Sequence, residues 1–155
     1  VLKERLLDLS PEFFQEKLIR SLLSAMGFEA EATPTYSPDG GIDVSGKFRM
    51  GVFSGDVRIQ VKRVASTIGV HPIRELRGSL EHEEQGVFIT TSTFTKKAIE
   101  EAENPRKKGG RIFLVDGERL AELILNFYED LDEDVKEELE RKLGLKKDFI
   151  IFKRT

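Results

Sequence analysis

The first clear hydrophobic pattern along the chain is helical and begins after Ser10. Ser10 suits an N-cap, and Pro11 suits the first helical position, where a missing amide hydrogen costs little. Apolar residues then recur three and four positions apart, at Phe14, Leu18, Ile19, Leu22, Leu23 and Met26. The pattern predicts an amphipathic helix that ends at Gly27.

Three segments with alternating apolar and polar residues follow this helix. Residues 28–33 alternate as far as Pro34, and the YSPDGG sequence of residues 36–41 is a concentrated turn signal. Residues 42–49 and 57–64 also alternate, with glycines and a serine between them. We expect one strand, a loop, and then an antiparallel hairpin with a long connection.

The second half of the chain alternates between helical patterns and short apolar runs. Helical spacing is present in residues 73–80, 95–103 and 120–127, and the runs at 86–90 (GVFIT) and 111–115 (RIFLV) are typical of buried strands. Early paired strands followed by alternating helices and buried strands predict the α/β class, with a mixed central sheet flanked by helices.

The C-terminal part is more highly charged. A short helix is predicted at residues 133–143, and the apolar residues 149–152 suggest an additional edge strand. We therefore expect residues 1–128 to form the main domain and residues 129–155 to form a charged extension packed on or next to it.

Composition excludes several kinds of protein. A chain of 155 residues with 39% hydrophobic and 34% charged residues fits one globular domain. The absence of Cys excludes disulfides, thiolate zinc sites and cysteine nucleophiles, and two His are too few for a histidine-rich metal site. No apolar run has the length of a membrane helix and no signal peptide is recognisable, so we expect a cytoplasmic protein.

Charge is unevenly distributed, although the net formal charge is only −3. Residues 116–148 are strongly acidic, whereas residues 47–77 contain seven basic and two acidic side chains. Such a basic stretch is compatible with a DNA backbone, and the simpler interpretation is an ordinary solvated face. Arg63, Arg74 and Arg77 are the candidate DNA contacts within it.

The predicted hairpin brings together residues suited to metal chemistry. Side chains alternate between the faces of a strand, so Gln60 and Lys62 point together, away from Ile59 and Val61. Asp43, at the start of the preceding strand, is placed to join them. A simpler interpretation treats Asp43 as a turn residue and the other two as the exposed side of an ordinary strand.

These groups match the preferences of Mg²⁺, for which Mn²⁺ is a possible substitute. The carboxylate of Asp43, the amide oxygen of Gln60 and the backbone carbonyl of Val61 are hard oxygen ligands. Lys62 would then orient or deprotonate a water on the metal, or stabilise charge on a phosphate.

The same residues resemble a nuclease motif. The sequences GGIDV at residues 40–44 and QVKR at residues 60–63 resemble the PD-(D/E)xK nuclease core, with Gln in place of the usual acidic residue. This D…QxK variant resembles the Mrr-type restriction endonuclease family. Further similar blocks are LLSAMGF (22–28), IRELRGSL (73–80), GVFITTSTFTKKA (86–98) and IFLVDGERLAELI (112–124). The resemblance covers residues 9–124, and an inactive member would share many of these blocks.

The resemblance implies a restriction-endonuclease-like fold, with Asp43 and Gln60 near a divalent metal and Lys62 as a catalytic residue. It also implies an acidic residue on the first helix. Glu16, eleven residues before Gly27, fits that place.

The first helix departs from the family pattern. The family's usual Phe-Glu pair is replaced by Gln15-Glu16, and the aromatic residue comes one position early, at Phe14. The alternative interpretation of Glu16 is therefore an ordinary exposed helix residue.

The leading functional hypothesis is a Mg²⁺-dependent endonuclease that hydrolyses phosphodiester bonds of double-stranded DNA. The resemblance further implies restriction of foreign or modified DNA, a homodimer, and a separate N-terminal DNA-recognition domain, for which residues 1–9 are too short. Two alternatives remain: a non-catalytic DNA-binding domain that retains the fold, and a junction-resolving or repair nuclease with the same core.

Overall fold

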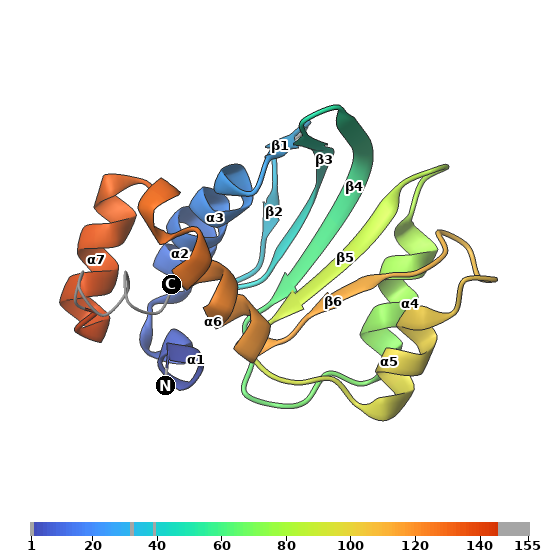
Figure 1. Cartoon of the computed structure of the whole chain (residues 1–155). Coiled ribbons are helices and arrows are strands. Elements are labelled where there is room, and N and C mark those ends of the chain that lie inside the picture. Colours follow the sequence, from blue (N-terminus) through green and yellow to red (C-terminus); the bar gives the residue numbers. More distant parts are fainter. Residues whose placement is uncertain (1, 32, 39, 146–155) are drawn as a thin grey trace.

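A six-stranded mixed sheet lies between two groups of helices (Figure 1) in the computed structural model, which describes residues 2–31, 33–38 and 40–145. The strands are β1 (Phe28–Ala30), β2 (Thr35–Tyr36), β3 (Ile42–Met50), β4 (Phe53–Lys62), β5 (Gln85–Thr90) and β6 (Phe113–Val115). The α/β class and the mixed central sheet expected from the sequence are confirmed.

The helices follow the hydrophobic periodicity closely. They are α1 (Leu2–Arg5), α2 (Pro11–Phe13), α3 (Arg20–Ala25), α4 (Val70–Ser79), α5 (Lys96–Glu103), α6 (Gly117–Asn126) and α7 (Glu133–Leu143). Short 3₁₀ turns occupy Leu6–Asp8 and Tyr128–Asp130. A π-helical turn at Phe14–Ile19 joins α2 to α3, so the helix predicted before Gly27 is continuous but not uniformly α-helical.

Side-chain caps fix the starts of three helices. The Ser10 hydroxyl accepts a hydrogen bond from the backbone N–H of Phe13, and Pro11 occupies the first helical position, as predicted. Thr95 caps α5 and Asp116 caps α6 in the same way. Each cap satisfies a backbone donor that the helix itself leaves unpaired.

The strand order is β1-β3-β4-β5-β6, with β2 paired to β3. The pairs that involve β3 are antiparallel, whereas β4, β5 and β6 run parallel. The sequence predicted a long connection within the hairpin, and that prediction is wrong. Strand pairing continues to Met50 and Phe53, so only Gly51 and Val52 form the turn. Gly51 has a φ of 60°, the left-handed conformation that such a tight turn needs.

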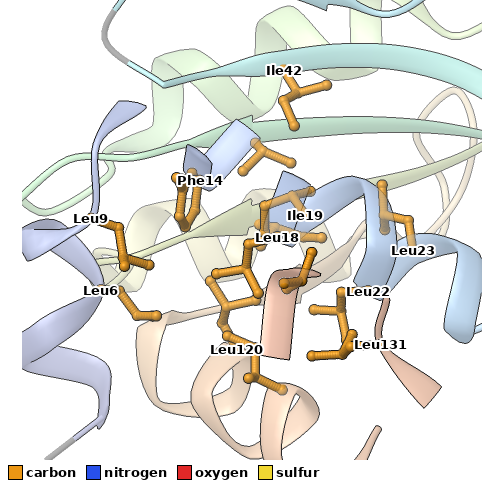
Figure 2. Packing of buried hydrophobic residues seen from close by; sticks show 14 of the residues in the cluster. Leu6, Leu9, Phe14, Leu18, Ile19, Leu22, Leu23, Ile42, Leu120 and Leu131 are labelled. Carbon is orange, nitrogen blue, oxygen red and sulfur yellow. The ribbon is translucent and has the colours of Figure 1, made fainter. Parts of the chain in front are cut away.

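Two hydrophobic clusters cover the two faces of the sheet. The larger one combines residues of the π-helical turn Phe14–Ile19, α3, α6 and α7 with the inward side chains of β3 and β4 (Figure 2). Leu6, Leu18 and Leu22 are fully buried in it. The smaller cluster packs Ile73 and Leu76 of α4 and Ala98 and Ala102 of α5 against the opposite face.

Residues 131–145 of the charged C-terminal part pack on the larger cluster. Val135, Leu139 and Leu143 of α7 are buried among its residues. The backbone N–H of Asp132 donates to the Ser21 hydroxyl at 2.9 Å. The edge strand expected at residues 149–152 lies outside the described residues. Within the described ranges, no helix has the length and apolar character needed to cross a membrane.

Candidate active site

Asp43 and Gln60 lie directly opposite each other in the β3–β4 ladder. Their neighbours Ile42, Ile59 and Val61 are buried in the larger cluster. Because side chains alternate along a strand, Asp43 and Gln60 project together from the other face of the sheet. The register thus brings the predicted carboxylate and amide side by side.

That face is the one on which α4 and α5 pack. Gln60 is paired with Phe88 of β5, and Phe88 belongs to the smaller cluster beneath these helices. Lys62, two residues further along β4, shares the face and is only partly buried. Helices α4 and α5 lie beside β5 and β6 in Figure 1, and the site is built on the adjoining β3–β4 hairpin.

Hydrogen bonds fix the backbone at Lys62. Its carbonyl accepts from the Thr90 hydroxyl at 2.9 Å and from the Thr91 N–H at 3.3 Å. Within the part of the chain that the structure describes, its ammonium has no hydrogen-bond or ion-pair partner. The strand therefore holds Lys62 in place and leaves its charge available for a ligand.

Two glycines shape the loop that leads into Asp43. Gly40 has a φ of +99°, which side chains other than glycine rarely allow. A Cβ atom on Gly41 would lie 2.5 Å from the Ser37 hydroxyl oxygen and 3.0 Å from the Val61 carbonyl oxygen. The chain therefore passes close to Val61, one of the predicted metal ligands.

Gln15, rather than Glu16, contacts this loop from the first helix. With its amide nitrogen turned toward the loop, Gln15 donates to the carbonyls of Gly41 and Ser37, each at 2.9 Å. Gln15 is 6% exposed, whereas Glu16 faces solvent. Among the described residues, no interaction joins Glu16 to Asp43. The sequence analysis did not propose Gln15 as a site residue. The position of Gln15 next to Phe14, on the buried side of the helix, could have indicated that its side chain faces the protein interior.

Arg58 was also missed, although it lies two residues before Gln60 and so on the same face. Its Nη1 is 3.4 Å from Asp43 Oδ1, and its Nε is 3.2 Å from Glu84 Oε1. The Glu84 side chain is 7% exposed and also accepts from the backbone N–H of Glu81 at 2.9 Å. Arg58 thus links Asp43 to a buried carboxylate in the turn between α4 and β5.

Arg63, for which contact with DNA stays a prediction, forms hydrogen bonds within the protein. Its Nη2 donates to the carbonyls of Leu7 and Leu9, both at 2.7 Å, and its aliphatic part packs against Gly40. These contacts tie the N-terminal segment to the loop before Asp43. We therefore assign Arg63 a structural role behind the site.

Arg77 is likewise occupied inside the protein. It donates to the Glu101 carboxylate at 3.0 Å and to the carbonyls of Lys108 and Gly110, both at 2.6 Å. Its side chain is 7% exposed, so the structure shows a structural role for Arg77, and its contact with DNA stays a prediction. Arg74, 62% exposed and 3.2 Å from the same carboxylate, remains accessible.

Glu101 is the shared partner of these cations. Burial alone would raise the pKa of its carboxyl, but hydrogen bonds from Lys107, Arg74 and Arg77 outweigh burial and hold that pKa below its ordinary value. The carboxylate therefore stays ionised and joins α4, α5 and the loop before β6.

Much of the basic stretch 47–77 is paired within the protein. Lys47 lies 2.7 Å from Asp56, and Arg49 lies 3.5 Å from Glu29. The hydrogen bond with Asp56 raises the pKa of Lys47. The cationic surface is consequently smaller than the count of basic residues suggested.

The donor set at Asp43 suits a small divalent cation. Among the described residues, no group of three or more His, Cys, Asp or Glu side chains could hold a metal ion. The predicted set contains one carboxylate, an amide and a backbone carbonyl, so it does not depend on such a group. Asp43 is 42% exposed, which leaves room for the waters that Mg²⁺ usually retains.

Comparisons with known proteins show what the sequence and the fold of the chain are similar to. A model of the Mrr catalytic domain, described as a restriction endonuclease, matches residues 6–124. The chain is 34% identical over 134 residues to the type IV methyl-directed restriction enzyme EcoKMrr of Escherichia coli K12, covering 79% of this chain and 40% of the relative. The structure of the DNA modification-dependent restriction endonuclease AspBHI is similar in fold, with a TM-score of 0.60 and 19% identity over 92% of this chain and 40% of that one.

Proposed function

Because the chain belongs to the Mrr-type restriction endonuclease family, we propose that it is the catalytic domain of a Mg²⁺-dependent endonuclease that cleaves double-stranded DNA. The supporting observation is the register that sets Asp43 against Gln60, with Lys62 on the same face. A fold retained only for binding would not need this combination of carboxylate, amide and unpaired ammonium.

The roles follow from the chemistry of each group. Asp43, Gln60 and the Val61 carbonyl would hold the cation, for which Mn²⁺ is a substitute. When bound, the metal supplies Lewis-acid polarisation of the phosphate and activates water. Lys62 places a compact ammonium beside the scissile phosphate, where it stabilises developing negative charge or exchanges a proton with the attacking water.

The substrate is a finer part of the proposal. EcoKMrr is named as methyl-directed and AspBHI as DNA modification-dependent, which supports restriction of foreign or modified DNA. We place this activity in the cytoplasm. The chain spans 40% of the length of each of these proteins. We assign recognition of the modification to a further domain, and we propose that a homodimer cuts both strands.

A cleavage assay tests the proposal. Modified and unmodified plasmids are incubated with the protein and Mg²⁺, Mn²⁺ or EDTA, alone and joined to a recognition domain. Lys62→Arg should retain DNA binding within a few fold and lose cleavage by roughly two orders of magnitude or more, because a guanidinium does not exchange protons near neutral pH. Lys97→Arg, at an exposed position on α5, is the matched control.

Two outcomes contradict the proposal. If the wild-type protein cuts no form of DNA with either metal, even when joined to a recognition domain, it is a binding module. If Lys62→Arg cuts as fast as wild type, the role of Lys62 is wrong even though cleavage is real.

A further inference from the structure

Arg58 occupies a position from which it can govern metal binding at Asp43. Its Nε is 3.2 Å from Glu84 and its Nη1 is 3.4 Å from Asp43, so one guanidinium spans both carboxylates. Arg58 is the register partner of Ser45, two residues along β3 from Asp43, so its side chain lies diagonally across the ladder from Asp43.

The two ends of this bridge are unequal. The Glu84 side chain is 7% exposed and is fixed by a second hydrogen bond from the backbone of Glu81, whereas Asp43 is 42% exposed. The contact with Asp43 is also the longer one. Arg58 is therefore anchored at Glu84, and the contact with Asp43 is the end that can open.

Space is present for the guanidinium to move. A groove of about 410 Å³ begins beside Ser45 and is lined by Lys47, Asp56, Arg58 and Glu84. Arg58 lines this groove, so its guanidinium has open space beside it in which to move away from Asp43.

We propose that Arg58 is a positioning residue that acts as a built-in counter-ion of Asp43 and competes with the divalent cation for its carboxylate. In the absence of metal, Arg58 neutralises the charge of Asp43 and holds its carboxylate beside the guanidinium. Metal binding requires the Nη1 contact to open, so Arg58 lowers the intrinsic affinity of the site. This inference rests on the proposed function, because it assumes that Asp43 is a metal ligand.

Measurement of Mn²⁺ binding without DNA, by electron paramagnetic resonance and calorimetry on the whole chain, tests the inference independently of cleavage. Arg58→Gln should bind Mn²⁺ roughly tenfold more tightly than wild type, the scale for removing one unit charge near a divalent ion in a partly exposed site. Arg58→Lys retains the charge and should return the affinity to within roughly threefold of wild type.

Arg49→Gln is the matched control. It removes one positive charge from the same face of the same strand pair, but six residues from Asp43, which is roughly 20 Å along a strand and beyond the screening length at physiological salt. Its Mn²⁺ affinity should equal that of wild type. If Arg49→Gln raises the Mn²⁺ affinity as much as Arg58→Gln does, the change reflects the net charge of the protein, and the specific competition by Arg58 is contradicted.

The outcomes separate this inference from the proposed function. If wild type and Arg58→Gln bind Mn²⁺ equally, Arg58 does not compete with the cation and the inference is overturned; loss of binding in Asp43→Asn would then still identify Asp43 as the ligand. If neither protein binds Mn²⁺, the metal site and the competition fail together. If Arg58→Gln binds more weakly than wild type, Arg58 supports the metal site and the inference is overturned.

Discussion

At the scale of single residues, the geometry around Asp43 depends on groups that are not themselves reactive. Gln15 donates to the loop from the first helix, and Gly41 brings that loop against the Val61 carbonyl. Arg63 fastens the same loop to the N-terminal segment. Asp43 is the second residue of β3, directly after this loop, and its proposed role needs such support because small displacements strongly reduce catalysis.

Gly41→Ala should destabilise the protein by roughly 1–3 kcal/mol, because the added methyl group would lie against the Ser37 hydroxyl and the Val61 carbonyl. Urea denaturation measures the change in the free energy of unfolding. Gly55→Ala is the control, since a Cβ atom at Gly55 meets nothing within 4 Å. Equal effects of the two substitutions would show that the close approach at Gly41 is unimportant.

At the scale of elements, α4 places two arginines in different environments. Arg74 is largely exposed, whereas Arg77 is buried against Glu101 and two backbone carbonyls. The sequence shows only that they are three residues apart. Whether such a residue contacts DNA or supports the fold depends on where α5 and the loop before β6 pack.

Arg74→Gln should therefore affect DNA binding, and Arg77→Gln should affect stability. Arg74→Gln should weaken DNA binding and reduce the slope of log affinity against log salt by about 0.9, with little change in stability. Arg77→Gln should reduce the free energy of unfolding by roughly 3 kcal/mol, because it breaks a buried ion pair. Salt-dependent binding curves measure the first effect, and urea denaturation measures the second. A stable Arg77→Gln protein with weakened DNA binding would contradict the structural role of Arg77.

The cluster at Glu101 also predicts a dependence of stability on pH. The folded state holds the pKa of Glu101 below its ordinary value of 4.5. Its contribution is therefore fully present above about pH 4.5 and declines as the pH falls through the lower pKa of the folded state. The stability difference between wild type and Glu101→Gln should be largest near neutral pH and shrink on acidification. A difference that is constant from pH 7 to pH 3 would contradict this.

At the scale of the whole molecule, α7 is part of the larger hydrophobic cluster although it lies beyond the residues that match the family. Tyr128 anchors the connection: its buried hydroxyl donates to the Glu140 carboxylate at 2.9 Å. Burial, followed by this hydrogen bond to Glu140, raises the pKa of Tyr128. The hydroxyl therefore remains protonated and continues to donate.

Leu139→Ala tests the contribution of α7. Leu139 is fully buried, so the substitution should reduce the free energy of unfolding by roughly 2–5 kcal/mol. Glu137→Ala, at an exposed position on the same helix, should change it by less than about 0.5 kcal/mol. Thermal and urea denaturation provide the comparison, and a small effect at Leu139 would mean that α7 unfolds independently of the core.

The sequence predicted elements more reliably than side-chain environments. Periodicity located the first helix, the hairpin and α7, because apolar spacing directly reflects burial. It overestimated the hairpin connection, since Ser54 and Gly55 resemble a loop but pair within β4. It could not distinguish Arg74 from Arg77 or find the link from Arg58 to Glu84, because those contacts join residues distant in the sequence.

The π-helical turn at Phe14–Ile19 has a consequence for alignment with the family. A π turn accommodates one residue more than the α-helical turn it replaces. Counting back from Gly27 identifies Glu16 with the family's helix acid, whereas counting forward from the aromatic Phe14 identifies Gln15. The two counts differ by one residue, which is the extra residue that the π-helical turn accommodates. The structure places Gln15, and not the exposed Glu16, against the loop before Asp43, so the π-helical turn determines which of the two side chains reaches the loop.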